Sequence, residues 1–372
     1  MLLRVRRALR DTRANLRFSL GRGLARLKGV QQYAGTPIPR NLSRVLVCRI
    51  NARMGNALFL TPFLQHLHEL LPSAAIDLAT SYPLAADLLG TLPGMRRIIV
   101  FPHKGWQLLW RYLAALRRLR AAPYDLVIDP APNSTSGRLI LMLCRSRYRL
   151  GFASEAQWAS LTHAVPAPEA ITHQARQALL LCQAFGAEAH LQRARLGLAL
   201  RPEELAAGRN AIARALGRAE DSACLARVFG FFGHATALKS IQPRYWLEFW
   251  KAFLELVPEA IPVEFLPSPR ALPIEVRFAA LHIASTRELA AAIAATRLFI
   301  SADTGPMHLA SATDTPTIAL FCASDPALYG PLKPSDVAID VTRCSPREVA
   351  QRCELLWHSP AAVLAQAKLR ED

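Results

Sequence analysis

The chain has 372 residues, of which 52% are hydrophobic, and it carries a formal net charge of +17. This length exceeds what one hydrophobic core usually organises, so we expect two folded domains, and the composition excludes a disordered or fibrous protein. No uninterrupted apolar run approaches the roughly 18 residues of a membrane-spanning helix, so we expect none.

Seven cysteines are spread along the chain without a CxxC pair or the spacing of a zinc site. Their odd number and apolar neighbours indicate buried thiols in a reducing compartment, and not a disulfide framework. No pair of histidines has the spacing of metal ligands, so we expect no metal site.

The first 40 residues form a separate basic segment. They contain ten Lys or Arg residues and a single acid, Asp11, and so supply +9 of the formal charge. Seven apolar residues between Leu2 and Leu27 share one face of a helical wheel, with arginines along its flank. We expect a basic amphipathic helix that lies on an anionic membrane surface.

Other interpretations of this segment stay open. A helix packed on the protein's own surface has the same pattern, and arginine-rich, acid-poor segments also resemble organellar transit peptides. Nucleic-acid binding has less support, because the segment offers only Phe18 and Tyr33 for stacking and contains no recognised motif.

Apolar runs and helical patterns then alternate from residue 44 to residue 185, which is typical of a doubly wound α/β domain. Thr61 and Pro62 form an N-cap and first-turn pair, or else Pro62 kinks a helix that began near Asn56. We expect strands at 44–50, 75–80, 97–101 and 125–129, and helices at 61–67, 106–120, 136–144 and 173–185.

The pattern restarts after a polar, Ala/Arg-rich segment near residues 190–222, which we interpret as the junction of two α/β domains. Such a pair implies a cleft between the sheet edges, where nucleotide-containing substrates usually bind. The expected parts are a tail and linker (1–40), an N-terminal domain (41–195), a C-terminal domain (196–350) and a C-terminal helix (351–372). In the second domain we expect strands at 225–232, 263–266, 281–283, 297–300 and 317–321, and helices at 245–256, at 288–295 and from residue 304.

Residues 297–321 are the most informative segment. An apolar strand ends in an acidic, glycine-containing turn, a helix begins at once, and a second strand follows. This order predicts a parallel strand–helix–strand unit. The backbone N–H groups of Thr304 and Gly305 would open that helix, where unpaired donors and the helix dipole favour a phosphate. The chain has no GxGxxG after its first strand and no GxxxxGK[ST], which disfavours a dinucleotide oxidoreductase and a P-loop NTPase.

Five short motifs follow one another along the chain. They lie at residues 53–62 (RMGNALFLTP), 124–129 (YDLVID), 148–152 (YRLGF), 233–246 (GHATALK ahead of YW) and 303–310 (DTGPMHLA). In this order they resemble the ADP-heptose:lipopolysaccharide heptosyltransferases of glycosyltransferase family 9. The resemblance implies a GT-B fold of two Rossmann-like domains and an inverting sugar transfer without a catalytic metal. It also implies a nucleotide-diphosphate-sugar donor, held mainly by the C-terminal domain, and an acceptor held mainly by the N-terminal domain.

The positive groups of the donor site follow from this resemblance. A departing diphosphate gains negative charge, so catalysis without a metal needs fixed positive groups aimed at it. Lys239 and the helix start at Thr304, Gly305 and Pro306 are the candidates for this role, and Gly305 lets a phosphate approach the backbone closely. A solvated surface lysine is the alternative for Lys239.

Three more side chains complete the expected donor site. Asp303 would accept hydrogen bonds from hydroxyls of the transferred sugar, His308 would contact the nucleotide, and Thr236 would add a hydroxyl to the phosphate. Asp303 is alternatively a helix cap, and His308 a helix histidine with a structural partner.

Asn56 departs from the family pattern, because it follows Gly55 where Gly-Asp is usual. An amide cannot take a proton from the acceptor hydroxyl as a carboxylate does. Asp129 or a substrate phosphate is then the base, or Asn56 orients the acceptor for a slower reaction, or the chain binds its ligands without turnover. We favour an active enzyme with Asn56 on the acceptor side, because the donor-side residues are present.

We therefore expect a hexosyl or heptosyl transferase that acts from ADP-heptose or another nucleotide sugar on a lipopolysaccharide core acceptor. We expect no cofactor and no nucleic-acid partner. The family's acceptor is a lipid-anchored saccharide, which places the protein on the cytoplasmic face of the bacterial inner membrane. The alternative is a weakened or inactive family member that acts as a membrane-associated glycan-binding or assembly protein, and a nicotinamide-dependent oxidoreductase ranks third.

Overall fold

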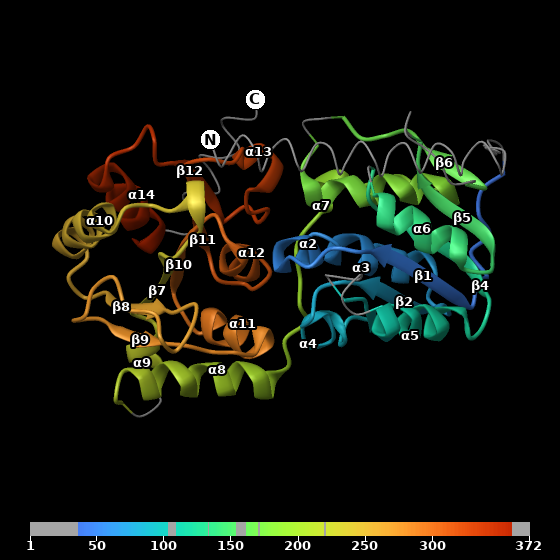
Figure 1. Ribbon diagram of the computed structural model, residues 1–372. Helices are drawn as coiled ribbons and strands as arrows, with labels where there is room; N and C mark the ends of the chain where they lie inside the picture. Colours follow the sequence, from blue (N-terminus) through green and yellow to red (C-terminus); the bar gives the residue numbers. More distant parts are fainter. Residues whose placement is uncertain are drawn as a thin grey trace, which may run out of the picture. The chain divides into compact units, whose positions relative to one another are not determined.

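The computed structural model describes residues 36–102, 109–132, 134–153, 161–169, 172–218 and 221–358. The chain divides into two compact units, unit 1 (Met1–Arg193) and unit 2 (Ala194–Asp372), which are both drawn in Figure 1. The amphipathic helix expected in the first 40 residues and the expected helical residues after 358 lie outside the described residues. None of the helices in the described ranges combines the length and hydrophobicity that crossing a bilayer requires.

Unit 1 contains a six-stranded parallel sheet in the order β3-β2-β1-β4-β5-β6. Its central strands are buried almost throughout, because helices of the crossover connections cover a parallel sheet. β5 and β6 extend the sheet beyond the strands expected from the sequence. The strands are β1 (Arg44–Arg49), β2 (Ala75–Thr80), β3 (Met95–Val100), β4 (Tyr124–Asp129), β5 (Ser146–Phe152) and β6 (His163–Val165).

The helices of unit 1 connect these strands. Ser134 begins α6, because its hydroxyl accepts the Gly137 N–H group at 2.8 Å. The described helices are α2 (Met54–Leu58), α3 (Thr61–Leu70), α4 (Ala85–Leu89), α5 (Leu109–Arg120), α6 (Thr135–Leu143) and α7 (Gln174–Gln177), with the 3-10 helices η1 (Ala178–Phe185) and η2 (Leu191–Arg193).

The structure rules out one of the two alternatives for Thr61 and Pro62, and it divides one helix expected in unit 1. Thr61 is the first residue of α3, and not its N-cap, which is Leu60. Its hydroxyl donates instead to the Leu58 carbonyl at 2.8 Å, at the break between α2 and α3. The single helix expected at 173–185 is a short α7 followed by the 3-10 helix η1.

Unit 2 contains a second six-stranded parallel sheet in the order β12-β11-β10-β7-β8-β9. If the strands of each unit are numbered from its own first strand, both sheets have the order 3-2-1-4-5-6. The two units therefore repeat one Rossmann-like topology. The strands are β7 (Val228–Phe232), β8 (Ile261–Phe265), β9 (Ala279–Leu281), β10 (Leu298–Ala302), β11 (Thr317–Phe321) and β12 (Val337–Asp340).

The helices of unit 2 include one that the sequence analysis missed. The polar segment near 190–222 contains α8 (Pro202–Ala215), which packs against α11, and Gly208 lies so close to the backbone of Ala291 that a side chain would clash there. The other described helices are α9 (Ser222–Leu225), η3 (Ala237–Lys239, 3-10), α10 (Pro243–Leu256), α11 (Thr286–Ala294), α12 (Gly305–Ser311), α13 (Pro326–Tyr329) and α14 (Pro346–His358).

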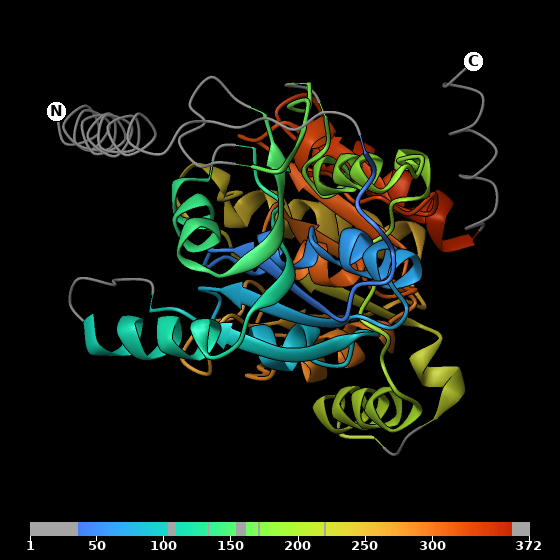
Figure 2. The same ribbon diagram turned by 90° about the vertical axis from the view of Figure 1, so that its right-hand side faces the viewer.

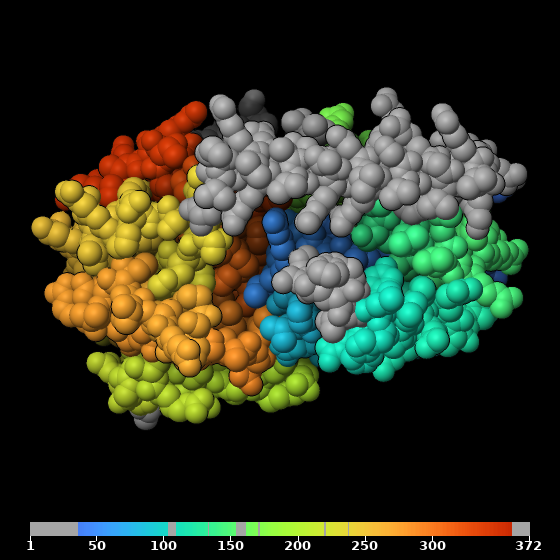
Figure 3. All heavy atoms as spheres, viewed as in Figure 1, coloured from blue at the N-terminus to red at the C-terminus, as the bar shows by residue number. Residues whose placement is uncertain are grey.

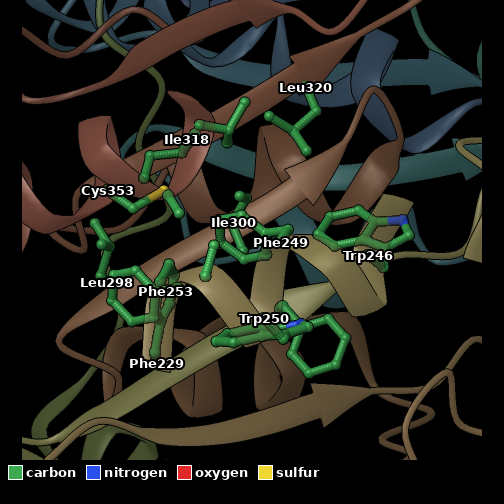
Figure 4. Close-up of a cluster of buried hydrophobic side chains, with 14 of the residues drawn as sticks. Phe229, Trp246, Phe249, Trp250, Phe253, Leu298, Ile300, Ile318, Leu320 and Cys353 are labelled. Atoms are coloured by element: carbon green, nitrogen blue, oxygen red, sulfur yellow. The ribbon is translucent and has the colours of Figure 1, made fainter. Parts of the chain in front are cut away.

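The core of unit 2 is rich in aromatic side chains (Figure 4). Phe229 of β7 meets Trp250 and Phe253 of α10 at ring-centroid distances of 5.1 and 4.8 Å. Ile300 and Leu320 of the neighbouring strands pack into the same cluster. Large aromatic groups bury much apolar surface, so this cluster fixes α10 against the sheet.

The prediction of buried free thiols is confirmed for most of the cysteines. All seven are free thiols, and five of them are buried. Burial raises the pKa of Cys182 to about 12, which keeps this thiol protonated and unreactive.

Candidate functional site

Each sheet has one position where the strand order reverses. It lies between β1 and β4 in unit 1 and between β7 and β10 in unit 2. Connections that leave two such strands diverge to opposite faces of the sheet, and ligands of parallel sheets bind beside their carboxyl ends. The residues that follow these four strands are therefore the candidate site residues.

Lys239 and Asp303 meet at this position of unit 2. The Lys239 Nζ atom lies 2.6 Å from Asp303 Oδ2, and the side chains are 43% and 3% exposed. Asp303 follows β10 directly, while Lys239 ends the short η3 helix after β7. The ammonium group is thus fixed by a nearly buried carboxylate while part of it still faces solvent.

Asp303 is not the cap of α12. The N-cap is Thr304, whose hydroxyl donates to the Ala302 carbonyl at 3.1 Å, and Gly305 and Pro306 form the first turn. The Asp303 carboxylate accepts a hydrogen bond from Ser324, in addition to the contact with Lys239. Of the two interpretations of Asp303, the helix cap is excluded by this geometry.

The other predicted donor-side residues differ in exposure. Thr236 is exposed, and its carbonyl accepts the Lys239 N–H group at 3.3 Å, so it belongs to the loop that carries Lys239. His308 lies in α12 with only 6% of its surface exposed, so its ring faces the protein interior.

A further pair at this edge was missed by the sequence analysis. His234 Nε2 lies 3.0 Å from Glu264 Oε1, and Glu264 Oε2 accepts the Ile274 N–H group at 2.8 Å. Phe232 pairs with Ser301 across β7 and β10, so His234 and Asp303 leave neighbouring strands at the same level. Burial raises the pKa of Glu264, although both hydrogen bonds act against this. The sequence showed His234 only as a member of the motif at 233–246, because its carboxylate partner Glu264 is 30 residues away.

Unit 1 has a pocket of about 590 Å³ at its corresponding position. Residues after β1 and β4 line it, together with residues at 167–169 and polar side chains of α7. Arg49 supplies a cation, and Asn51, Ser134 and Gln177 supply hydrogen-bonding groups. Such a lining suits a hydroxyl-rich ligand.

Asn56 lies next to this pocket in a fixed orientation. Its side-chain oxygen Oδ1 accepts a hydrogen bond from Arg49 Nη2 at 3.2 Å, and its side-chain nitrogen Nδ2 donates to Asn51 Oδ1 at 3.1 Å. Asn51 Oδ1 also accepts the Arg53 N–H group at 2.9 Å, so the loop after β1 is held together by side-chain amides. Asn56 therefore positions Arg49 and Asn51, two of the residues that line the pocket.

Asp129 is enclosed at the end of β4. Its side chain is fully buried, Oδ2 lies 3.3 Å from Arg138 Nε, and Oδ1 accepts the Ala131 N–H group at 3.2 Å. Burial raises the pKa of Asp129 to about 7, although Arg138 and Arg49 favour its ionised form. A carboxylate without solvent exposure is poorly placed to receive a proton from a substrate, so this geometry favours a structural role.

The free energy of unfolding should depend on whether Asp129 is ionised. The pKa is about 7 in the fold and about 3.9 in an unfolded chain, so the folded protein binds the extra proton between these values. The stabilisation is complete below about pH 4 and lost as the pH rises to about 7, by at most about 1.4 kcal/mol per pH unit. When the free energy of unfolding is measured with denaturant as a function of pH, Asp129→Asn should lack this part of the pH dependence. An unchanged pH dependence would contradict the assignment. Asp336, whose pKa is raised to about 6, contributes equally to the parent and the variant.

Metal ligands are not gathered within the described ranges. No group of three His, Cys, Asp or Glu side chains there is arranged to hold a metal ion.

Comparison with known proteins relates part of unit 2 to one family. Residues 281–358, from the end of β9 to α14, match the family model Glycosyltransferase family 9 (heptosyltransferase). This range contains Asp303 and His308. No curated protein sequence matches the chain.

Solved structures match over almost their whole length. A glycosyl transferase family 9 protein from Veillonella parvula has a TM-score of 0.73 at 18% identity, covering 87% of this chain and 99% of that one. E. coli heptosyltransferase WaaC, solved with ADP, has a TM-score of 0.66 at 20% identity over 84% and 99%. E. coli ADP-heptose lps heptosyltransferase II has a TM-score of 0.66 at 19% identity over 87% and 99%. The likeness confirms the expected α/β fold of the GT-B heptosyltransferases.

Proposed function

We propose that the chain is a heptosyltransferase-like glycosyltransferase of family 9, because residues 281–358 match the family model and the fold resembles that of solved heptosyltransferases. The chain transfers a heptose or a similar sugar from a nucleotide-diphosphate donor to a lipopolysaccharide core saccharide, with inversion at the anomeric carbon. The observation that carries this proposal is the Lys239–Asp303 pair at the strand ends of β7 and β10.

Unit 2 holds the donor in this proposal. Its diphosphate gains negative charge as the bond to the sugar breaks, and a fixed ammonium group stabilises that charge more in the transition state than in the bound donor. Asp303 holds Lys239 in place and accepts hydrogen bonds from sugar hydroxyls. Thr236 and the helix start at Thr304 to Pro306 bind the phosphates and the nucleotide. His308, with 6% of its surface exposed, is not assigned a contact with the nucleotide. WaaC has been solved with ADP, which supports a nucleotide of this kind as the donor's carrier.

Lys239 supplies the positive charge in this mechanism, so the proposal assigns no metal and no cofactor. Transfer should be measured with ADP-heptose and a truncated core acceptor, with and without EDTA. Sugar transfer that persists in EDTA is the expected result. Donor binding without either transfer or hydrolysis would favour the second candidate, a glycan-binding protein on a transferase scaffold, to which the amide at position 56 lends support.

Unit 1 holds the acceptor, and Asn56 acts there. Asn56→Ala removes the group that orients Arg49 and Asn51, so transfer should fall about tenfold or more while donor affinity stays nearly unchanged. Asn56→Asp restores a carboxylate at this position and should raise transfer above that of Asn56→Ala. Steady-state kinetics with each substrate varied separately makes this comparison. An equal loss of donor binding in Asn56→Ala would contradict an acceptor-side role.

The location at the inner face of the bacterial inner membrane is part of the proposal, because a lipid-anchored acceptor lies there. Residues 1–40 attach the chain to the anionic surface in this scheme, although most of them lie outside the described residues. Their removal should weaken binding to anionic vesicles, and unchanged binding at low and high salt would exclude this role.

A further inference from the structure

Helix α5 of unit 1 presents large apolar side chains to solvent. Leu109, Trp110 and Leu113 are 60%, 65% and 42% exposed, although a side chain of this size is usually covered in a folded protein. Another side of the helix packs on unit 1, since Ala115 and Leu119 are buried in the hydrophobic core. The exposed residues are therefore not the core-facing side of the helix.

The same helix is strongly basic. Its sequence contains Arg111, Arg117, Arg118 and Arg120 and no acidic residue. All four arginines are exposed, and none of them forms an ion pair within the described part of the chain. The Arg111 guanidinium lies 4.9 Å from the centroid of the Trp110 ring, so cation and aromatic ring share one surface.

The helix lies on the outside of unit 1. It runs beside the edge strand β3, and Figures 2 and 3 show its teal ribbon and side chains at the surface of that unit. We call the exposed side chains of Leu109, Trp110, Leu113 and the four arginines the α5 face. This face joins an apolar first half of the helix to a cationic last turn.

We propose that the α5 face docks on the surface of an anionic lipid bilayer. Leucine and tryptophan at the start of the helix enter the boundary between headgroups and acyl chains, where an indole ring is favourable. The arginines reach lipid phosphates, and each basic group near an anionic surface adds to the attraction. Arginines at a helix C-terminus also complement the helix dipole, but that effect accounts only for the charge and leaves Trp110 and its leucine neighbours unexplained.

The class of the partner follows from the charge and the hydrophobicity of the α5 face together. A neutral or zwitterionic membrane would satisfy the apolar half alone, whereas an anionic one satisfies both halves of the α5 face. This inference is independent of the transfer reaction, because it uses no residue of the candidate site. It also differs from the role proposed for residues 1–40, which are unchanged in the experiment.

The experiment measures binding of the full chain to vesicles that contain phosphatidylglycerol, by co-sedimentation at low and high salt. Leu109→Gln/Trp110→Gln/Leu113→Gln should lower the partition coefficient about tenfold or more without a change of charge. Arg117→Gln/Arg120→Gln should lower it by about tenfold at low salt and less at high salt.

The control variants change exposed residues of unit 2, and the two apolar residues among them are more exposed than those of the α5 face. Leu272→Gln/Val276→Gln removes apolar side chains that are 84% and 82% exposed, and Arg214→Gln/Arg218→Gln removes two exposed arginines. Both should bind like the parent, and circular dichroism and thermal unfolding should be equal for all variants. Three results would overturn the proposal: parent-like vesicle binding by the α5 variants, an equal loss in the controls, or an equal effect of Arg117→Gln/Arg120→Gln on phosphatidylcholine vesicles. Loss of self-association with unchanged vesicle binding would assign the face to a second copy of the chain, and would overturn it too.

Discussion

Lys239→Ala is expected to lower kcat for sugar transfer by about 10²–10³-fold, the usual cost of removing one group that stabilises charge in a transition state. The Lys239 Nζ atom is held 2.6 Å from Asp303 Oδ2, so the ammonium group needs little reorganisation when the diphosphate departs. Donor affinity should fall much less than kcat, because the charge on the leaving group grows only as the bond breaks. Steady-state kinetics and equilibrium binding of ADP separate the two effects.

Two further variants test whether the effect belongs to the position of the charge. Lys251→Ala removes an exposed lysine on α10 of the same unit and should leave transfer unchanged. Lys239→Arg keeps a cation and should retain part of the activity, although the guanidinium fits the contact with Asp303 differently. Equal activities of Lys239→Ala and Lys251→Ala would remove Lys239 from the mechanism.

Most of the strands were predictable because they are buried on both faces, whereas β5, β6 and β12 were not expected. Val45 to Cys48 of β1 and Leu298 to Ile300 of β10 are continuous apolar runs, and both lie in buried strands. The edge strand β6 is only three residues long and half-buried, so no local pattern marks it. Helix α8 was missed because its many alanines and charged residues hide the narrow stripe, including Gly208 and Ile212, that packs on α11.

The candidate site was predictable where one short motif carries it. The segment from Asp303 to His308 combines a strand end, a turn and a helix start, and its pairing with Lys239 follows from the adjacency of β7 and β10. The pair of His234 and Glu264 was not predictable, because a buried carboxylate in β8 reads as an interruption of an apolar strand. The enclosure of Asp129 by Arg138 depends likewise on packing between β4 and α6 and leaves no local signal.

Arg138→Met is expected to destabilise the chain by about 3–5 kcal/mol, the range found when one partner of a buried ion pair is removed. Arg138 is 3% exposed, lies 3.3 Å from Asp129 Oδ2 and donates to the Phe152 carbonyl at 2.6 Å. Methionine fills similar space but leaves that carbonyl unpaired and the carboxylate uncompensated. The pKa of Asp129 should then rise above its value of about 7. The variant should therefore lose more stability at about pH 8.5 than at about pH 5.5, where Asp129 is protonated in both the folded parent and the folded variant.

Denaturant unfolding at both pH values measures this loss, and two variants identify its source. Arg244→Met breaks an exposed pair with Glu248 of 2.7 Å and should cost about 0.5 kcal/mol or less. Arg138→Met/Asp129→Asn removes the uncompensated carboxylate, so it should be more stable than Arg138→Met at about pH 8.5, with a coupling free energy that vanishes at low pH. The stability losses of the two single substitutions could instead add up to that of the double variant at both pH values. Arg138 would then act only by filling space and binding the Phe152 carbonyl, and not by stabilising the carboxylate of Asp129.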